Sequence, residues 1–125
     1  MKDLPSPTRP LIWVGSNRKD YGEFPIAVQE LCGFELFLAQ TGQFPPSAKP
    51  LKGFGGGLVE LISRYDGDAF RTVYTVRFEK AVYVLHAFKK KSKSGIKTPQ
   101  TDIELIKRRL RDAQQDYAMR INGRQ

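Results

Sequence analysis

The sequence predicts an α+β domain: a small twisted antiparallel sheet, made of an N-terminal strand and a three-stranded meander, with N-terminal helices and a C-terminal helix. Three consecutive segments rich in β-branched and aromatic residues predict the meander, namely LVELISRY (58–65), AFRTVYTVRF (69–78) and AVYVLHAF (81–88). Helical apolar periodicity before and after these segments predicts the helices. A length of 125 residues suits a single domain with its own core.

The N-terminal part of the chain predicts a strand followed by helices. LIWVGS (11–16) is a short apolar and aromatic run, so we expect the first strand there, with Ser16 as a candidate N-cap for a short polar turn. Pro25 suits the first turn of the next helix, and Gly42 suits its end. Six residues of this helix form a wide apolar stripe that we expect to pack on the sheet: Val28, Leu31, Cys32, Phe34, Phe37 and Leu38.

The middle strand of the meander divides its side chains between two faces. Arg71, Val73, Thr75 and Arg77 point one way, and Thr72, Tyr74, Val76 and Phe78 point the other way. The sequence Asp-Gly-Asp (66–68) predicts the turn before this strand, and Glu-Lys (79–80) predicts a short turn after it. We expect helices on one face of the sheet and a partly open face, framed by arginines, on the other.

A loop rich in proline and glycine, residues 43–57, precedes the meander. Its glycines do not indicate a phosphate cradle, because no Gly-Lys-Ser/Thr follows them and no helix begins there. We expect a mobile loop beside a binding surface, with Phe54 and Tyr65 as candidates for stacking on a nucleobase.

The last helix is expected to begin after Thr98-Pro99. Thr101 and Glu104 have the spacing of a capping box. Five apolar residues recur at steps of three and four and therefore share one face: Ile103, Ile106, Leu110, Ala113 and Tyr117. The whole chain is expected to be one domain, with residues 1–10 and 119–125 flexible.

Composition excludes several classes of protein. No apolar run approaches the ~18 residues that a membrane span requires, and the N-terminus has no apolar segment typical of a secretory signal. The single cysteine, Cys32, excludes an internal disulfide framework and a thiolate metal cluster, and we expect it in the core. These observations favour a soluble cytoplasmic protein without a membrane partner.

The net charge of +8 is concentrated at one end of the sequence. Lysine and arginine balance aspartate and glutamate over residues 1–79, so the whole excess lies in residues 80–125. A concentrated positive field attracts polyanions, most often nucleic acid. A solvated basic helix that serves only solubility is the alternative.

The stretch YVLHAFKKKSKSGIKTP (83–99) delivers this charge directly after a strand. The only histidine, His86, lies three residues before the lysines, and Arg71 lies on the neighbouring strand. We expect these side chains to form a concave phosphate-binding site. The alternatives are a hydrogen-bonded core role for His86, a solvated lysine loop, and an Arg71 that merely pairs with Glu60 or Asp68.

The sequence resembles the phage-derived, HigB-like branch of the RelE/ParE toxin superfamily over roughly residues 11–115. The resemblance is carried by LKGFGGGLVEL, FRTVY, the block HAFKKKSKSGIKTP and IELIKRRL. It implies a RelE-like, microbial-RNase-like fold and a type II toxin–antitoxin toxin that cleaves mRNA on the ribosome without a metal or cofactor. It also implies a helix-turn-helix antitoxin and a toxin–antitoxin hetero-oligomer.

The resemblance also assigns roles to residues. Arg71 matches the arginine that contacts the scissile phosphate, and His86 lies where some relatives carry a catalytic histidine. The family's Glu-Leu-Arg is Glu60-Leu61-Ile62 here, which leaves Arg64 as the only nearby replacement for its arginine. Thr98-Pro99 matches the Thr-Pro that opens the last helix. The expected catalytic residues are Arg71, His86 and Lys90, and the expected RNA-binding residues are Lys52, Arg64, Arg77, Lys89, Lys91 and Lys93.

Metal-free RNA cleavage needs a group that accepts the 2′-OH proton, cations that stabilise the phosphorane, and an acid for the 5′-oxygen. The fork of Arg71 suits the phosphorane. Crowded lysines, whose pKa falls through mutual repulsion, and His86 are the candidates for proton transfer. Two other functions stay open: a ParE-type toxin that acts on DNA gyrase, and a degenerate toxin that binds RNA and its antitoxin without turnover.

Overall fold

The computed structural model describes residues 8–90 and 98–123 of the chain. Its elements, in chain order, are β1 (Leu11–Trp13), α1 (Asn17–Gly22), α2 (Ile26–Gln40), β2 (Ala48–Pro50), β3 (Leu58–Tyr65), β4 (Asp68–Thr75), β5 (Val82–Lys90) and α3 (Gln100–Asn122). The five strands form one sheet in the order β1-β5-β4-β3-β2. The α+β class expected from the sequence is confirmed.

The sheet differs from the expected one in two details. Strand β2 adds an edge strand within the proline-rich loop, where Ala48–Pro50 pairs with Leu61–Val59 of β3. Strand β1 runs parallel to β5, so the sheet is mixed. Neither detail has a sequence signal: two of the three β2 residues are a lysine and a proline, and no tight turn links β1 to β5 to fix their relative direction.

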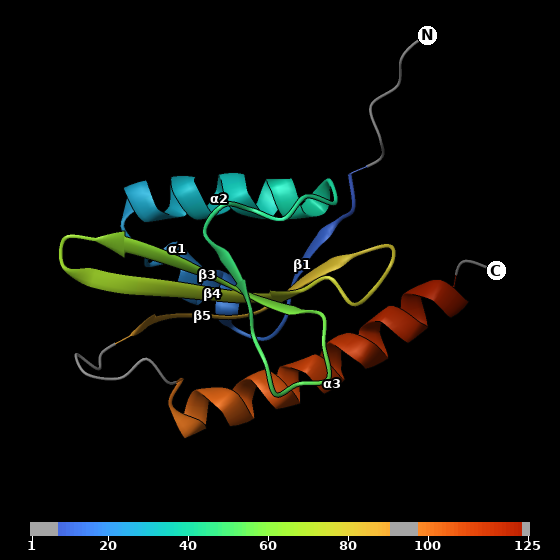
Figure 1. Ribbon diagram of the computed structural model, residues 1–125. Helices are drawn as coiled ribbons and strands as arrows, with labels where there is room; N and C mark the ends of the chain where they lie inside the picture. The colour runs from blue at the N-terminus through green and yellow to red at the C-terminus, as the bar shows by residue number, and fades with distance from the viewer. Residues whose placement is uncertain (1–7, 91–97, 124–125) are drawn as a thin grey trace, which may run out of the picture.

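Helices cover both faces of the sheet, which corrects the expectation of one open face. Helix α2 lies on one side and α3 on the other, as Figure 1 shows. Val73 and Leu85 pack toward α3, whereas Tyr74 and Val84 pack toward α2. All of Val82–Ala87 is buried. A continuous apolar run such as AVYVL is typical of a strand that is covered on both faces.

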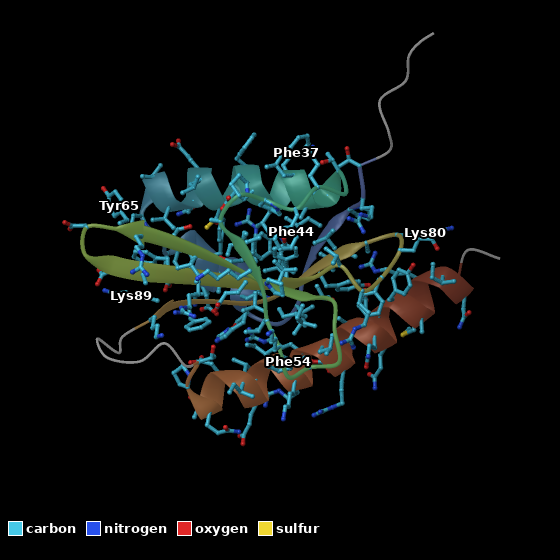
Figure 2. The ribbon with its side chains drawn as sticks, viewed as in Figure 1. Phe37, Phe44, Phe54, Tyr65, Lys80 and Lys89 are labelled. Atoms are coloured by element: carbon cyan, nitrogen blue, oxygen red, sulfur yellow. The ribbon has the colours of Figure 1, made fainter. Side chains whose placement is uncertain are left out.

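Helix α2 has the expected position but turns a different side to the sheet. Val28 and Cys32 are buried as expected, whereas Leu31, Phe34 and Phe37 are about half exposed. Figure 2 shows Phe37 on the side of α2 that faces away from the sheet. The buried positions of its second half are Glu35, Leu36 and Ala39. The helix is apolar over most of its circumference, so periodicity could not single out the buried side.

The connections around the meander also differ from expectation. The hairpin turn between β3 and β4 is confirmed, with Asp66 and Gly67 at positive φ. Strand β4, however, ends at Thr75, so the connection to β5 is longer than the expected two-residue turn. Helix α3 begins at Gln100, with Pro99 at the N-cap position and no side-chain cap, so Thr101 does not cap it.

An irregularity in the β4–β5 pairing determines which way His86 points. Tyr74 pairs with Val84, but the next pair is Val73 with His86, so Leu85 is an extra residue on β5. Such a bulge reverses the alternation of side chains beyond it. As a result Leu85 and His86 both face α3, and Phe88 and Lys90 follow His86 on that face.

Gly15 lets the chain turn from β1 into α1 close to α3. It has a φ of +66°, and a Cβ there would come within 2.8 Å of the Arg109 Nε. We expect Gly15→Ala to lower the free energy of unfolding by about 1–3 kcal/mol because both the backbone and Arg109 must adjust. Urea denaturation followed by circular dichroism measures this loss.

Gly22→Ala is the matched control for this prediction. Gly22 ends α1, and apart from its chain neighbours and the backbone of its own helix no heavy atom lies within 4 Å of the position its Cβ would take. We expect a change within about 0.5 kcal/mol there. Equal stability changes in the two variants would show that the contact between Gly15 and Arg109 does not matter.

Candidate functional site

The candidate site lies on the α3 side of β3, β4 and β5, toward the hairpin that joins β3 to β4. The strand register arranges its side chains in three neighbouring rows, each with one residue from β3, β4 and β5: Glu60, Val73 and His86; Ile62, Arg71 and Phe88; Arg64, Ala69 and Lys90. Side chains in adjacent positions of such rows lie about 5 Å apart at Cβ. Three cations, one from each strand, therefore meet in two adjacent rows.

Arg71 occupies the centre of this arrangement. It is 8 % exposed, and its Nη1 donates to Glu60 Oε2 at 2.8 Å. The pairing of Arg71 with Glu60 that the sequence left as an alternative is therefore present. Its Nε is buried and has no hydrogen-bond partner among the described residues. Glu60 neutralises only part of the local charge, because Arg64 and Lys90 lie in the next row.

Lys90 is the last residue of β5 and is 9 % exposed. Burial lowers the pKa of its ammonium group, and the positive charges of Arg71 and Arg64 lower it further, while Glu60 opposes them. Lys90 therefore loses its proton more readily than an ordinary lysine does. This combination of one buried carboxylate and three cations suits a bound phosphate.

His86 is buried and both of its ring nitrogens face protein groups. Nε2 lies 2.7 Å from Asp102 Oδ1, and Nδ1 lies 3.3 Å from Arg109 Nη1. Since Arg109 can only donate, Nδ1 is the acceptor and the proton belongs on Nε2. Burial lowers the pKa of His86, which Asp102 partly counteracts. In this arrangement the ring orients Asp102, and it stacks on Phe88 with 4.6 Å between centroids.

The other sequence-predicted residues are dispersed. Lys89 faces the opposite side of β5, where its Nζ lies 3.2 Å from Asp68 Oδ2. Arg77 donates hydrogen bonds to the carbonyl oxygens of Phe54 and Gly56. These bonds attach the loop of residues 43–57, which was expected to be mobile, to the connection after β4. Lys52 is exposed on the same loop, outside the three rows. Lys91 and Lys93 lie outside the described residues.

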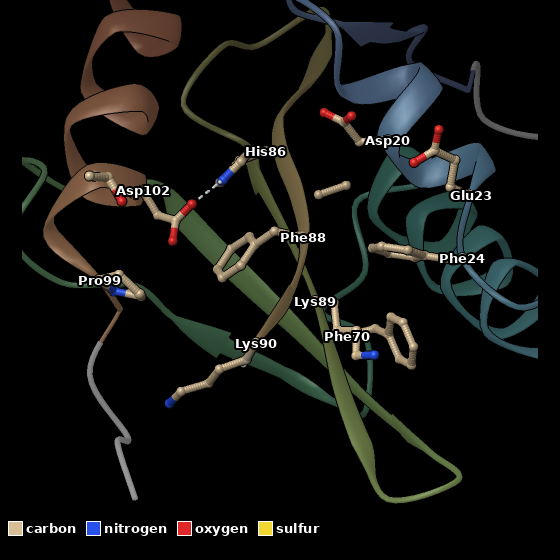
Figure 3. A pocket seen from close by; sticks show the side chains of 12 residues that line it. Asp20, Glu23, Phe24, Phe70, His86, Phe88, Lys89, Lys90, Pro99 and Asp102 are labelled. Atoms are coloured by element: carbon tan, nitrogen blue, oxygen red, sulfur yellow. Dashed lines mark hydrogen bonds and ion pairs between the residues drawn. The ribbon is translucent and has the colours of Figure 1, made fainter. Parts of the chain in front are cut away.

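An open pocket of about 870 Å³ adjoins the rows where β5 extends beyond β1. Figure 3 shows His86, Phe88 and Asp102 on its α3 side, with Asp20 of α1 and Glu23, the residue after α1, opposite. Asp102 and Phe88 are not among the site residues that the sequence predicts. The motif YVLHAFKKK places Phe88 near the lysines, but nothing in the sequence links Asp102 to His86.

Comparison with protein families gives a match to the Gp49-like phage-derived proteins over residues 19–111. The match covers about three quarters of the chain, including α2, the whole meander and half of α3. The chain belongs to the Gp49-like family. Gp49-like proteins are a phage-derived, toxin-like family of the RelE/HigB type, which agrees in general terms with the resemblance seen in the sequence. No curated protein and no solved structure matches the chain.

Two further findings concern the described part of this Gp49-like protein. None of its helices has the length and apolar character that a membrane crossing requires. Within residues 8–90 and 98–123, histidine, cysteine, aspartate and glutamate do not form a group of three that could hold a metal ion.

Proposed function

We propose that this Gp49-like protein is the toxin of a type II toxin–antitoxin system and an endoribonuclease that cleaves mRNA on the ribosome. The observation that carries the proposal is the meeting of Arg64, Arg71 and Lys90 on one face of the sheet, at the edge of an open pocket. Membership of a toxin-like family supports a toxin role, which in turn implies an antitoxin partner. For that antitoxin we propose a helix-turn-helix protein that covers this basic face.

The proposed reaction is attack of a ribose 2′-OH on the adjacent phosphorus. Arg71 binds two oxygens of the phosphate and stabilises the phosphorane, since its fork is positioned by Glu60. Its Nε is buried and donates to none of the described residues. A transition state with more charge on these oxygens binds this site better than the substrate does, which is the source of the rate enhancement.

Proton transfer is proposed to involve Lys90. Burial beside Arg71 lowers the pKa of Lys90 and so favours its neutral amine. The neutral amine accepts the 2′-OH proton, or the ammonium form of Lys90 donates a proton to the 5′-oxygen. His86 is proposed to act through Asp102, because the described contacts occupy both ring nitrogens. His86 is therefore a positioning residue in this proposal, which holds Asp102 in place at the edge of the pocket.

Arg64 is proposed to replace the arginine of the family's Glu-Leu-Arg motif. Residues two apart on a strand share a face, so Arg64 presents its charge on the same side as position 62, one row nearer the hairpin. The remaining basic residues are proposed to contact the RNA backbone outside the reacting phosphate: Lys52, Arg77, Lys89, Lys91 and Lys93. Affinity that depends on such contacts falls steeply as salt rises.

Lys90→Met should reduce single-turnover cleavage of a defined mRNA by about 100-fold, because both a phosphate contact and a proton-transfer group are lost. Lys89→Met removes the same charge from the adjacent residue, but on the opposite face of β5, and should cost only a few-fold. Cleavage is measured by primer extension on translating ribosomes, in parallel with thermal melting of each variant.

Lys107→Met is the matched control, since Lys107 is an exposed lysine of α3 outside the site, and its cleavage rate should equal that of the unchanged protein. Equal losses in the variants at Lys89 and Lys90 would contradict the proposed face. If the unchanged protein instead produced DNA breaks that depend on gyrase and left mRNA intact, the nuclease proposal would be replaced by a ParE-type function.

A further inference from the structure

The pocket beside β5 combines an aromatic surface with a fixed hydrogen-bond acceptor. Phe88 lines the pocket and is only partly buried. One face of its ring is covered by His86, at an interplanar angle of 19°. A planar ligand in the pocket could extend this stack by contacting the other face of Phe88. Nucleobases stack on aromatic side chains in this way in proteins that bind single-stranded RNA.

The position of Phe88 also relates the pocket to the proposed phosphate site. Phe88 is directly opposite Arg71 in the strand register, and Lys90 follows two residues later on the same face. These separations are about 5 Å across the strands and about 7 Å along β5. A base stacked on Phe88 would therefore have its own phosphate group within reach of Arg71 and Lys90.

The charges favour a base in the pocket and a phosphate beside Arg71 and Lys90 over the opposite placement. Asp20 of α1 and Glu23, which follows it, form the α1 wall, and Asp102 lies on the α3 side. The two lysines of the lining, Lys89 and Lys90, lie at the end of β5. Carboxylates repel a phosphate but accept hydrogen bonds from the amino and imino groups of a base. The base therefore belongs in the pocket, and the phosphate belongs among the cations.

Asp102 is the carboxylate whose orientation the structure fixes. Its Oδ1 lies 2.7 Å from the His86 Nε2, and Arg109 holds the other side of that ring. The second oxygen of Asp102 points away from His86 in Figure 3. A carboxylate accepts about four hydrogen bonds, so the one from His86 leaves acceptor capacity on both oxygens. Two adjacent acceptors match a base edge that carries two adjacent donors.

We propose that this pocket binds a guanine base of the RNA, with Phe88 as its stacking platform and Asp102 as the acceptor that recognises it. Guanine alone among the four RNA bases presents two neighbouring donors, N1–H and the N2 amino group, on its Watson–Crick edge. Adenine, cytosine and uracil each present one donor group on that edge. The proposal rests on the proposed function, because it assumes that Arg71 and Lys90 hold the phosphate of the same nucleotide.

Binding of the four ribonucleoside 3′-monophosphates, measured by isothermal titration calorimetry, tests the proposal without requiring catalysis. We expect guanosine 3′-monophosphate to bind with an affinity at least about tenfold higher than the other three nucleotides, which is the discrimination that one bidentate base contact provides. Phe88→Leu keeps the apolar packing but removes the ring, and should weaken all four ligands by about tenfold.

Asp102→Asn distinguishes recognition from general charge. Asparagine can still accept the hydrogen bond from His86, so the fold should persist, but its amide donors oppose those of guanine. We expect the preference for guanosine over adenosine 3′-monophosphate to fall from about tenfold to about twofold or less, because the bidentate contact to the base is lost. Glu23→Gln removes the same charge from the α1 wall and should leave the preference intact.

The outcomes separate this proposal from the proposed function. Equal affinity of the unchanged protein for all four nucleotides would overturn guanine recognition even if the protein cleaves mRNA. A guanine preference that survives Asp102→Asn but is lost in Glu23→Gln would overturn the role of Asp102. A guanine preference that follows Asp102, in a protein that leaves mRNA intact, would support the pocket and remove the nuclease.

Discussion

Arg71→Lys should lower the single-turnover rate of mRNA cleavage by about two to three orders of magnitude, the usual effect of removing one oriented donor from a transition state. Lysine keeps the positive charge beside Glu60, so the buried pair persists. It has no planar fork, however, and cannot bind two phosphate oxygens in parallel. The rate is measured with protein in excess over a ribosome-bound mRNA, so that product release does not contribute.

Arg64→Lys provides the matched control for this substitution. Arg64 lies on the same face, one row nearer the hairpin, but it is exposed and has no ion pair with another described residue. The same change there should cost only a few-fold. A lysine variant at Arg71 that folds normally and cleaves within about threefold of the unchanged protein would contradict a role for the guanidinium fork in the transition state.

Glu60→Ala should destabilise the fold by about 3–5 kcal/mol, because it leaves the guanidinium of Arg71 buried without its counter-charge. Both side chains of the pair are at most a tenth exposed, and the Nη1–Oε2 distance is 2.8 Å. Chemical denaturation followed by circular dichroism measures the change in the free energy of unfolding.

The double variant Glu60→Leu with Arg71→Met should restore most of that loss, since an apolar pair of similar volume avoids the unpaired charge. The double variant should nevertheless be inactive in cleavage. This combination separates stability from function: a stable, inactive double variant shows that the ion pair is retained for its chemistry. A loss of less than about 1 kcal/mol in Glu60→Ala would mean that Arg71 finds water or another partner.

The sequence predicted the strands of the meander better than it predicted the strands that pair with the edges of the meander. β3 has the expected bounds, and β4 and β5 lie close to theirs, because β-branched and aromatic runs interrupted by Asp-Gly give a strong local signal. The parallel pairing of β1 depends on contacts between segments that are about 70 residues apart. No local pattern specifies such a contact, and the same holds for the edge strand β2.

The candidate site shows the same division between local and long-range information. The alternation of β4 correctly placed Arg71 with Val73, on the side opposite Thr72 and Tyr74. It was wrong for Phe78, which lies beyond the end of β4 and packs in the same cluster as Val73. The same alternation applied to β5 would have placed His86 and Lys90 on the wrong face, because the extra residue Leu85 reverses the order. Bulges of this kind follow from packing against neighbouring elements more than from the residue itself.

Asp102 illustrates a contact that spacing could not reveal. It lies in the first turn of α3, sixteen residues after His86, where an acidic residue is expected simply because it complements the helix dipole. Only the packing of α3 against β5 brings it to the imidazole ring. Arg109, two helical turns further on, reaches the other ring nitrogen in the same way.

The most direct test of the central claim is the cleavage of one defined mRNA on translating ribosomes by the unchanged protein and by the Arg71→Lys, Lys90→Met and Lys107→Met variants. We expect fragments ending in a 2′,3′-cyclic phosphate for the unchanged protein and for Lys107→Met, and little or no cleavage for the other two variants. Equal cleavage by all four proteins, or none by the unchanged protein on translating ribosomes, would contradict the claim that Arg71 and Lys90 converge on a reacting phosphate.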